Sequence, residues 1–187
     1  MIRNTREAIQ VALAHAYLGT TNTANMSTYG CPIDRSSGNA AYIMANAVQM
    51  AKVRAAVNGF KDKNISDFLN YTYGPDVEAM QKHDKQRNLA NTVTAKAFNG
   101  SYRGKKVDRL GKIAWLAVED TRIGILMGKA LPVSAYIANT DINPTTWSRD
   151  WAKYLRDALM VLKGFDHIGV SMVSITVREI CDAEKDS

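Results

Sequence analysis

Apolar residues recur at helical spacing along most of this 187-residue chain, and this periodicity limits the possible folds strongly. Between Thr5 and Leu18 the apolar positions fall three and four residues apart, and Gly19 follows as a stop signal. The same spacing returns in four further segments, Ser37–Asn58, Ile65–Tyr71, Asp76–Phe98 and Val107–Glu119. Such stripes are buried when helix packs on helix. We therefore predict an all-α fold of several helices that needs no metal and no cofactor.

Loops and glycines divide the predicted helices into two parts. The polar stretch Thr20–Ser37 predicts a long loop, so residues 1–79 are expected to form an N-terminal helical arm or subdomain. Residues 80–187 are expected to form the body of the protein. Within this body, the segment Asp120–Leu131 either extends the preceding helix or forms an apolar loop.

The sequence lacks the signals of several other protein classes. No apolar run approaches the roughly 18 residues that a membrane helix needs, and the N-terminus does not resemble a signal peptide. The two cysteines, Cys31 and Cys181, are too few for a disulfide framework and too far apart for a structural zinc site. His15, His83 and His167 are scattered, which favours surface roles over metal binding. We expect a cytoplasmic protein that does not bind membranes.

The positive charge of the chain is concentrated in one short stretch. The formal net charge is +6, but residues 81–112 alone hold nine basic and two acidic residues. The preceding residues carry a net charge of +1 and the following residues −2. A local positive field attracts polyanions, of which phosphate backbones are the commonest. The alternative is a solvated surface that only aids solubility.

Residues 133–163 have the pattern of a helix-turn-helix. A short helix, Ser134–Asn139, is followed by a turn and by Asn143-Pro144, a good N-cap and first helical residue. One face of the second helix is apolar and is expected to be core: Trp147, Trp151, Tyr154, Leu155, Ala158, Leu159 and Leu162. The opposite face is polar, and we predict that it reads DNA bases: Thr145, Thr146, Arg149, Lys153 and Arg156. Two antiparallel helices with a polar outer face also occur in helical domains of other functions.

The basic stretch lies just ahead of this motif. Its cations are predicted to contact DNA phosphates or a protein partner: Lys96, Arg103, Lys105, Lys106 and Arg109. Phosphate contacts would position the protein, and the polar helix face would supply specificity.

Several short motifs occur along residues 84–159 in a fixed order: Asp84-Lys85-Gln86, Tyr102-Arg103-Gly104, Pro132-Val133-Ser134-Ala135-Tyr136, Thr146-Trp147-Ser148-Arg149 and Asp157-Ala158-Leu159. Taken in this order, they resemble the Q late-gene antiterminators of lambdoid phages. The resemblance covers roughly residues 80–165, and the Thr-Trp-Ser-Arg piece is its most specific part. The lambda member of the family carries paired Cys-x-x-Cys motifs ahead of its helix-turn-helix. This chain has none, so residues 120–131 are expected to replace that zinc element by apolar packing.

The resemblance implies a transcription factor that is not an enzyme. Such a protein binds double-stranded DNA at a phage late promoter, engages paused host RNA polymerase and makes it read through pauses and terminators. It would act in the cytoplasm of the bacterial host cell. Sigma factor, nascent RNA and a second copy of the chain on DNA are further candidate partners. The apolar segment Ile123–Met127 is expected either to contact polymerase or to pack inside.

Two other functions fit the same residues. A transcriptional repressor would use the same helix-turn-helix without contacting polymerase. A phage magnesium-dependent nuclease or junction resolvase would hold the metal with Asp108, Glu119 and Asp120 beside the basic stretch.

Overall fold

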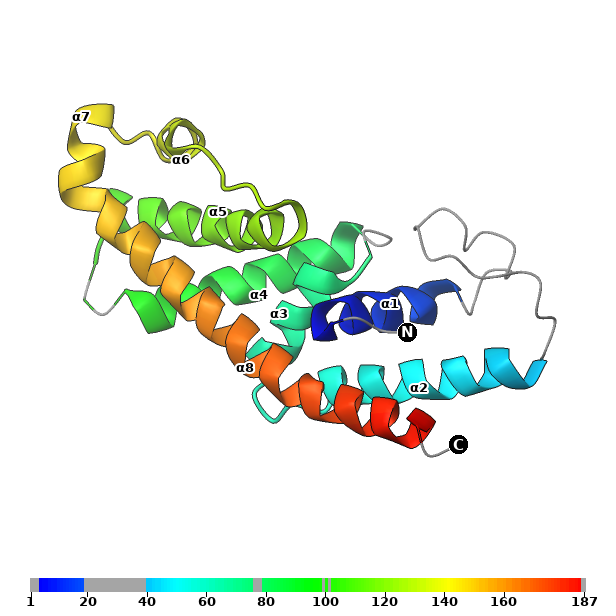
Figure 1. The fold of residues 1–187 in the computed structure, drawn as a ribbon. Helices are drawn as coiled ribbons and strands as arrows, with labels where there is room; N and C mark the ends of the chain where they lie inside the picture. The colour runs from blue at the N-terminus through cyan, green and yellow to red at the C-terminus, as the bar shows by residue number, and fades with distance from the viewer. Residues whose placement is uncertain (1–3, 19–39, 76–78, 99, 101, 186–187) are drawn as a thin grey trace.

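The computed structural model describes residues 4–18, 40–75, 79–98, 100 and 102–185. Every regular element in these ranges is a helix, which confirms the predicted all-α fold (Figure 1). The predicted loop Thr20–Ser37 and Cys31 lie outside the described residues. The helices are α1 Thr5–Leu18, α2 Ala40–Asn58, α3 Lys63–Tyr73, α4 Ala79–Ala97, α5 Lys105–Met127, α6 Val133–Thr140, α7 Pro144–Thr146, the π-helical turn η2 Trp147–Trp151, and α8 Ala152–Lys185.

The last three elements form one continuous helix from Pro144 to Lys185, which crosses the whole molecule (Figure 1). Its inner face is buried, and α8 packs on α1, α2, α3, α4 and α5. At Gly169 the lack of a side chain allows α3 to approach closely, because a Cβ there would lie 2.9 Å from the Leu69 side chain. By length and composition this helix is also apolar enough to cross a membrane. The core helix of a bundle meets the same criterion, so the finding does not indicate a membrane span.

Several predicted helix boundaries need correction. The predicted helix Val107–Glu119 begins at Lys105 and continues to Met127, where Gly128 ends it in the left-handed region with φ 66°. The ambiguous segment is therefore mostly helix, and the apolar-loop alternative is wrong. The second helix of the predicted motif does not end near residue 163 but continues to Lys185. Of the predicted helix Asp76–Phe98, α4 accounts for Ala79–Ala97, and residues 76–78 lie outside the described ranges.

A polar network fastens the N-terminal helices to α8. The Arg6 guanidinium of α1 donates to Asp166 of α8 at 2.6 Å and to the Tyr73 hydroxyl of α3 at 3.0 Å. Tyr73 in turn donates to the other oxygen of Asp166 at 2.6 Å. Because these three residues come from three helices, the network fixes how α1, α3 and α8 pack. The predicted boundary between an N-terminal arm or subdomain and the body, near residue 80, stays a prediction.

Candidate nucleic-acid interface

A buried carboxylate holds the connection between α5 and α6. Asp120, near the end of α5, accepts a hydrogen bond from the backbone N–H of Leu131 at 2.6 Å and one from the Tyr136 hydroxyl at 2.7 Å. Burial, followed by this hydrogen bond to Asp120, raises the pKa of Tyr136, which keeps the phenol protonated. The expected apolar packing of residues 120–131 is therefore only part of the explanation. A charged anchor positions α6 on α5.

Arg109 of α5 secures the turn that follows α6. Its guanidinium donates to the backbone carbonyls of Thr140 at 3.2 Å and Asp141 at 2.7 Å, which the end of a helix leaves without partners. Asp141 has φ 53° in the left-handed region, a conformation that aspartate tolerates better than most residues. The Arg109 guanidinium also lies 5.7 Å from the Trp151 ring. This residue therefore supports the turn between α6 and α7.

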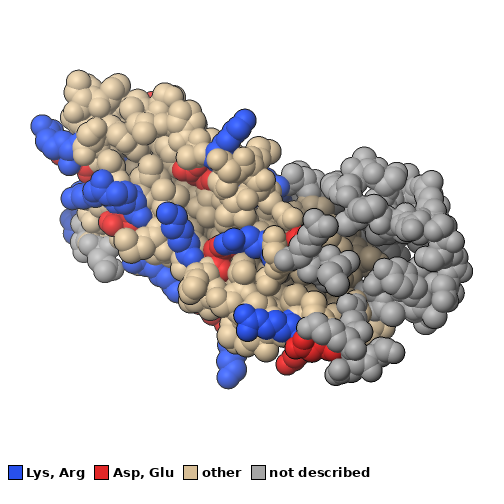
Figure 2. Space-filling view, in the orientation of Figure 1, with Lys and Arg blue, Asp and Glu red and all other residues tan. Residues whose placement is uncertain are grey.

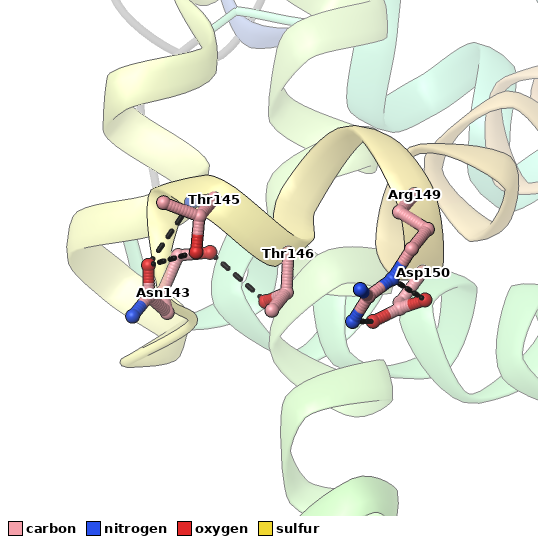
Figure 3. A network of polar contacts seen from close by, with 5 residues as sticks. All are labelled: Asn143, Thr145, Thr146, Arg149 and Asp150. Atoms are coloured by element: carbon pink, nitrogen blue, oxygen red, sulfur yellow. Dashed lines mark hydrogen bonds and ion pairs between the residues drawn. The ribbon is translucent and has the colours of Figure 1, made fainter.

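The long helix begins where Asn143-Pro144 predicts (Figure 3). The Asn143 side-chain oxygen accepts from the Thr145 backbone N–H at 3.0 Å and from the Thr145 hydroxyl at 2.8 Å. The Thr146 hydroxyl donates to the Asn143 carbonyl at 3.0 Å. Both threonine hydroxyls thus donate their protons to hydrogen bonds within the cap. Toward a ligand outside the cap, each hydroxyl can therefore only accept a hydrogen bond. The sequence pattern did not reveal this.

A π-helical turn comes directly after the cap. The Ala152 N–H donates to the Trp147 carbonyl, five residues back. Trp147 is buried, and its ring lies 5.8 Å from that of Tyr136, so it ties this turn to α6. Such turns are rare and occur frequently at functional sites. Here the turn contains the Trp-Ser-Arg part of the Thr-Trp-Ser-Arg motif.

The structure places the predicted base-reading residues on one side of this helix start, opposite its core face. Thr145, Arg149, Lys153 and Arg156 are exposed, and Thr146 is half-buried. The side chain of Arg149 is 75% exposed and pairs with its neighbour Asp150 through two bonds of 2.9 and 2.8 Å. Arg149 lowers the pKa of Asp150 and keeps it ionised. Neighbouring side chains on a helix do not normally face each other, so this pair could not be predicted from the sequence pattern.

Further cations lie at the start of α5, beside this helix. Arg103 and Lys105 are exposed, and the Lys106 ammonium lies 4.4 Å from the Tyr102 ring and 5.4 Å from the Tyr154 ring. A hydrogen bond from Lys106 lowers the pKa of Tyr154. Tyr102 and Tyr154 were not predicted as site residues. They join the start of α5 to the start of α8 and hold Lys106 between them.

Not all the predicted phosphate contacts gather here. The Lys96 ammonium lies 3.8 Å from Asp62 and 5.2 Å from the Phe165 ring, beside α3 and the middle of α8. Phe165 is twelve residues beyond Lys153, which corresponds to about 18 Å along a helix. Figure 2 shows lysines and arginines at the end of the molecule where Figure 1 places α7 and the start of α8. We define the interface end as the exposed or half-buried residues Arg103, Lys105, Lys106, Thr145, Thr146, Arg149, Lys153 and Arg156.

The three carboxylates of the nuclease alternative do not form a metal site. Asp108 and Asp120 lie twelve residues apart on the same helix, roughly 18 Å of helical rise. Both oxygens of Asp120 accept structural hydrogen bonds, and Glu119 accepts one from the Tyr71 hydroxyl. Among the described residues no group of histidine, cysteine, aspartate or glutamate side chains could hold a metal ion. These three carboxylates therefore lack the geometry that the nuclease alternative requires.

A family model described as phage antitermination protein Q matches residues 6–186, nearly the whole chain. No curated protein and no solved structure gives a significant match. The matched range includes both the Arg6 network and the interface end, so it is not confined to the helix-turn-helix pattern.

Proposed function

The chain belongs to the phage antitermination protein Q family, and we propose that it binds DNA at a late-promoter element and modifies paused host RNA polymerase. The membership supports a role as a phage antitermination factor in the cytoplasm of the bacterial host. It is a regulatory family, so the proposal includes no catalytic residue. The DNA contact and the polymerase contact are argued below from separate observations.

The observation that carries the DNA contact is an exposed polar helix face on a rigid base. The base consists of the Asp120 anchor, the Arg109 contacts with the turn and the Trp147 contact with Tyr136. Rigid supports of this kind keep exposed side chains in one geometry, as base recognition requires. In a helix-turn-helix the first residues of the second helix face the base edges. Those residues here are Thr145, Thr146 and Arg149.

The cap determines how each residue would recognise bases. The threonine oxygens would accept hydrogen bonds, for example from the amino groups of adenine or cytosine. The Arg149 fork would donate two hydrogen bonds to guanine after leaving Asp150. Lys153 and Arg156 lie further along the same face and would contact bases or nearby phosphates.

The start of α5 favours phosphate. Gly104 precedes this helix without a side-chain cap, and its first turn holds Lys105, Lys106 and the carboxylate of Asp108, which pairs with Lys112 at 3.2 Å. Cations at a helix N-terminus are disfavoured by the helix dipole, whereas an anion there is stabilised by both the dipole and the exposed N–H groups. A phosphate bound here would neutralise this unfavourable arrangement. Arg109 is already engaged with the turn, so we assign it a positioning role in DNA binding.

The polymerase contact is proposed for the other end of α5. Ile123 and Ile125 are half-buried, while Leu126 is exposed and Met127 is 69% exposed. These two exposed apolar side chains lie beside the connection that Asp120 anchors. Exposed apolar groups of this kind suit a protein partner. Sigma factor, nascent RNA and a second copy of the chain remain candidates for further contacts.

Transcription of a template with the phage late promoter and a downstream terminator tests the proposal. The complete chain is expected to increase readthrough by purified host polymerase, and Arg149→Ala is expected to reduce that increase. Lys163→Ala, which removes an exposed cation further along α8, is the matched control and should act like the unmodified chain. Reduced initiation without readthrough would favour a repressor. Unchanged readthrough despite confirmed promoter binding would contradict the proposal.

A further inference from the structure

A second basic region lies among α1, α2, α3 and α4, away from the interface end (Figure 1). It is a cavity of about 180 Å³, and none of the described residues that line it carries a carboxylate. Three cations and three side-chain amides contribute to its wall: Arg54, Lys82, Lys85, Asn58, Asn70 and Gln81. Neither the sequence patterns nor the family match drew attention to these residues as a group.

The cations of this cavity come from two helices, and one of them lies over an aromatic ring. Arg54 is on α2, whereas Lys82 and Lys85 are on α4. The Lys82 ammonium lies 5.6 Å from the ring of Tyr71, a buried residue of α3, and the Arg122 guanidinium lies 5.9 Å from the same ring. Burial and the nearby charge of Arg122 lower the pKa of Lys82, and the charge of Glu119 opposes this effect.

The amides add directional hydrogen bonding to this charge. The Asn70 amide nitrogen donates to the Asn58 side-chain oxygen at 3.0 Å and to the Ser66 carbonyl at 2.9 Å. These bonds orient the Asn58 amide, whose own N–H groups can then donate to a ligand. The wall thus combines a guanidinium fork, two ammonium groups and an oriented amide, all of which are hydrogen-bond donors.

We propose that this cavity binds the phosphate group of a nucleotide, either free or as part of a nucleic-acid strand. A phosphate offers several oxygen acceptors and suits donors that converge from different directions. The proposal rests on the cavity and not on the DNA-reading role of the interface end. The two can therefore fail separately.

Titration of the full ¹⁵N-labelled chain tests this site directly. Adenosine monophosphate and a ten-nucleotide single-stranded RNA are the probes, and adenosine is the control that lacks phosphate. The side-chain amide signals of Asn58, Asn70 and Gln81 report on the cavity and not on the interface end. We expect adenosine monophosphate to shift them with saturation and adenosine to leave them unchanged. Saturation by the RNA at lower concentration assigns the phosphate to a strand, and the reverse order assigns it to a free nucleotide.

Two double variants that remove the same charge distinguish a specific phosphate site from general electrostatic attraction. The double variant Arg54→Gln/Lys85→Gln is expected to weaken binding at least about tenfold, since charge-assisted hydrogen bonds are worth about that factor or more each. Lys52→Gln/Arg87→Gln removes the same charge from exposed positions on the same helices and should change affinity by less than about twofold.

Several outcomes would overturn the proposal. They are equal losses in the two double variants, equal shifts with adenosine and adenosine monophosphate, or no shift with any probe. A pentaglutamate peptide that saturates the same signals at lower concentration than both nucleotide probes would also overturn it, because it would identify the site as one for an acidic protein segment.

Discussion

Two arginine–aspartate pairs, one at the middle of α8 and one at the start of the long helix, have similar geometry and different surroundings. Arg6 and Asp166 are 160 residues apart in sequence, lie 2.6 Å apart and share Tyr73 as a third partner. Arg149 and Asp150 are adjacent, lie 2.8 Å apart and join no two helices. The Asp166 side chain is only 11% exposed, whereas that of Asp150 is 44% exposed.

The difference between the pairs shows which arginine is available for binding. In the N-terminal network, separating the pair would leave the mostly buried Asp166 carboxylate with only one of its two donors, the Tyr73 hydroxyl, which is costly. At the interface end, water can replace either partner, so the pair exchanges readily for other contacts. The first pair therefore holds the fold together. The second keeps a donor fork at the surface, where the proposed contact with DNA would replace Asp150.

The largest expected effect is on stability, at Asp166. Asp166→Ala should lower the free energy of unfolding by about 3 kcal/mol, because Tyr73 and Arg6 lose a shared acceptor in a partly buried place. Asp150→Ala should leave the urea midpoint unchanged. Denaturation monitored by circular dichroism measures both variants. Equal losses of unfolding free energy in Asp166→Ala and Asp150→Ala would contradict the distinction between the two pairs.

The Asp120 anchor should give the next largest effect. Asp120→Asn keeps the size of the side chain but presents an amide N–H to one of two donors, so a loss of about 1–3 kcal/mol is expected. Asp108→Asn, an exposed site on the same helix, is the control and should cost about 0.5 kcal/mol or less. If both variants unfolded at the same urea concentration, the connection between α5 and α6 would not depend on this carboxylate.

High pH should lower the free energy of unfolding through three buried tyrosines. Burial raises the pKa of Tyr71, Tyr73 and Tyr136 above the usual value of 10.0, so the phenols contribute stability that is complete below that pH. As pH rises above about 10 the unfolded chain ionises first, and each phenol lowers stability by about 1.4 kcal/mol per pH unit. Urea denaturation between pH 8 and 11 measures this. Tyr73→Phe and Tyr136→Phe should each reduce the slope, and an unchanged slope in both would refute the assignment.

The smallest expected effect concerns the charge of Asp150. Asp150→Ala frees the Arg149 fork and removes one negative charge from the interface end, so affinity for random duplex DNA should rise a few-fold at low salt. Asp157→Ala removes a carboxylate two turns further along the exposed surface of α8 and serves as the comparison. Fluorescence anisotropy at several salt concentrations measures both. A fall in affinity for Asp150→Ala would mean that this residue supports DNA binding.

Local signals predicted much of the interface end. Asn143-Pro144 placed the start of the long helix correctly, and the spacing of Trp147, Tyr154 and Ala158 identified its core face. These features depend on helical periodicity and on one capping residue, both of which the sequence contains directly. The π-helical turn was not predicted, because a change of one residue in hydrogen-bond spacing leaves the apolar pattern almost unchanged.

Contacts between distant residues could not be predicted from one sequence. Arg6 and Asp166 have no shared motif, and Asp120 was considered as a metal ligand because its burial was unknown. The cavity between α2 and α4 depends on how the helices pack. Periodicity predicts which face of a helix is buried, but not which neighbour covers it. This is also why the second helix was expected to end near residue 163, before its contacts with α1 and α2 were known.

The most direct test of the account is the DNA specificity of Arg149→Ala compared with Arg6→Ala. The duplex that the unmodified chain selects from a random pool supplies the specific site, and a scrambled duplex supplies the reference. Arg149→Ala should fold normally and lose about 1–3 kcal/mol of discrimination between the two duplexes. Arg6→Ala should be less stable but, below its melting temperature, should keep the discrimination of the unmodified chain. If Arg149→Ala kept the same ratio of specific to random binding, the exposed helix face would not read DNA, and the account would be wrong.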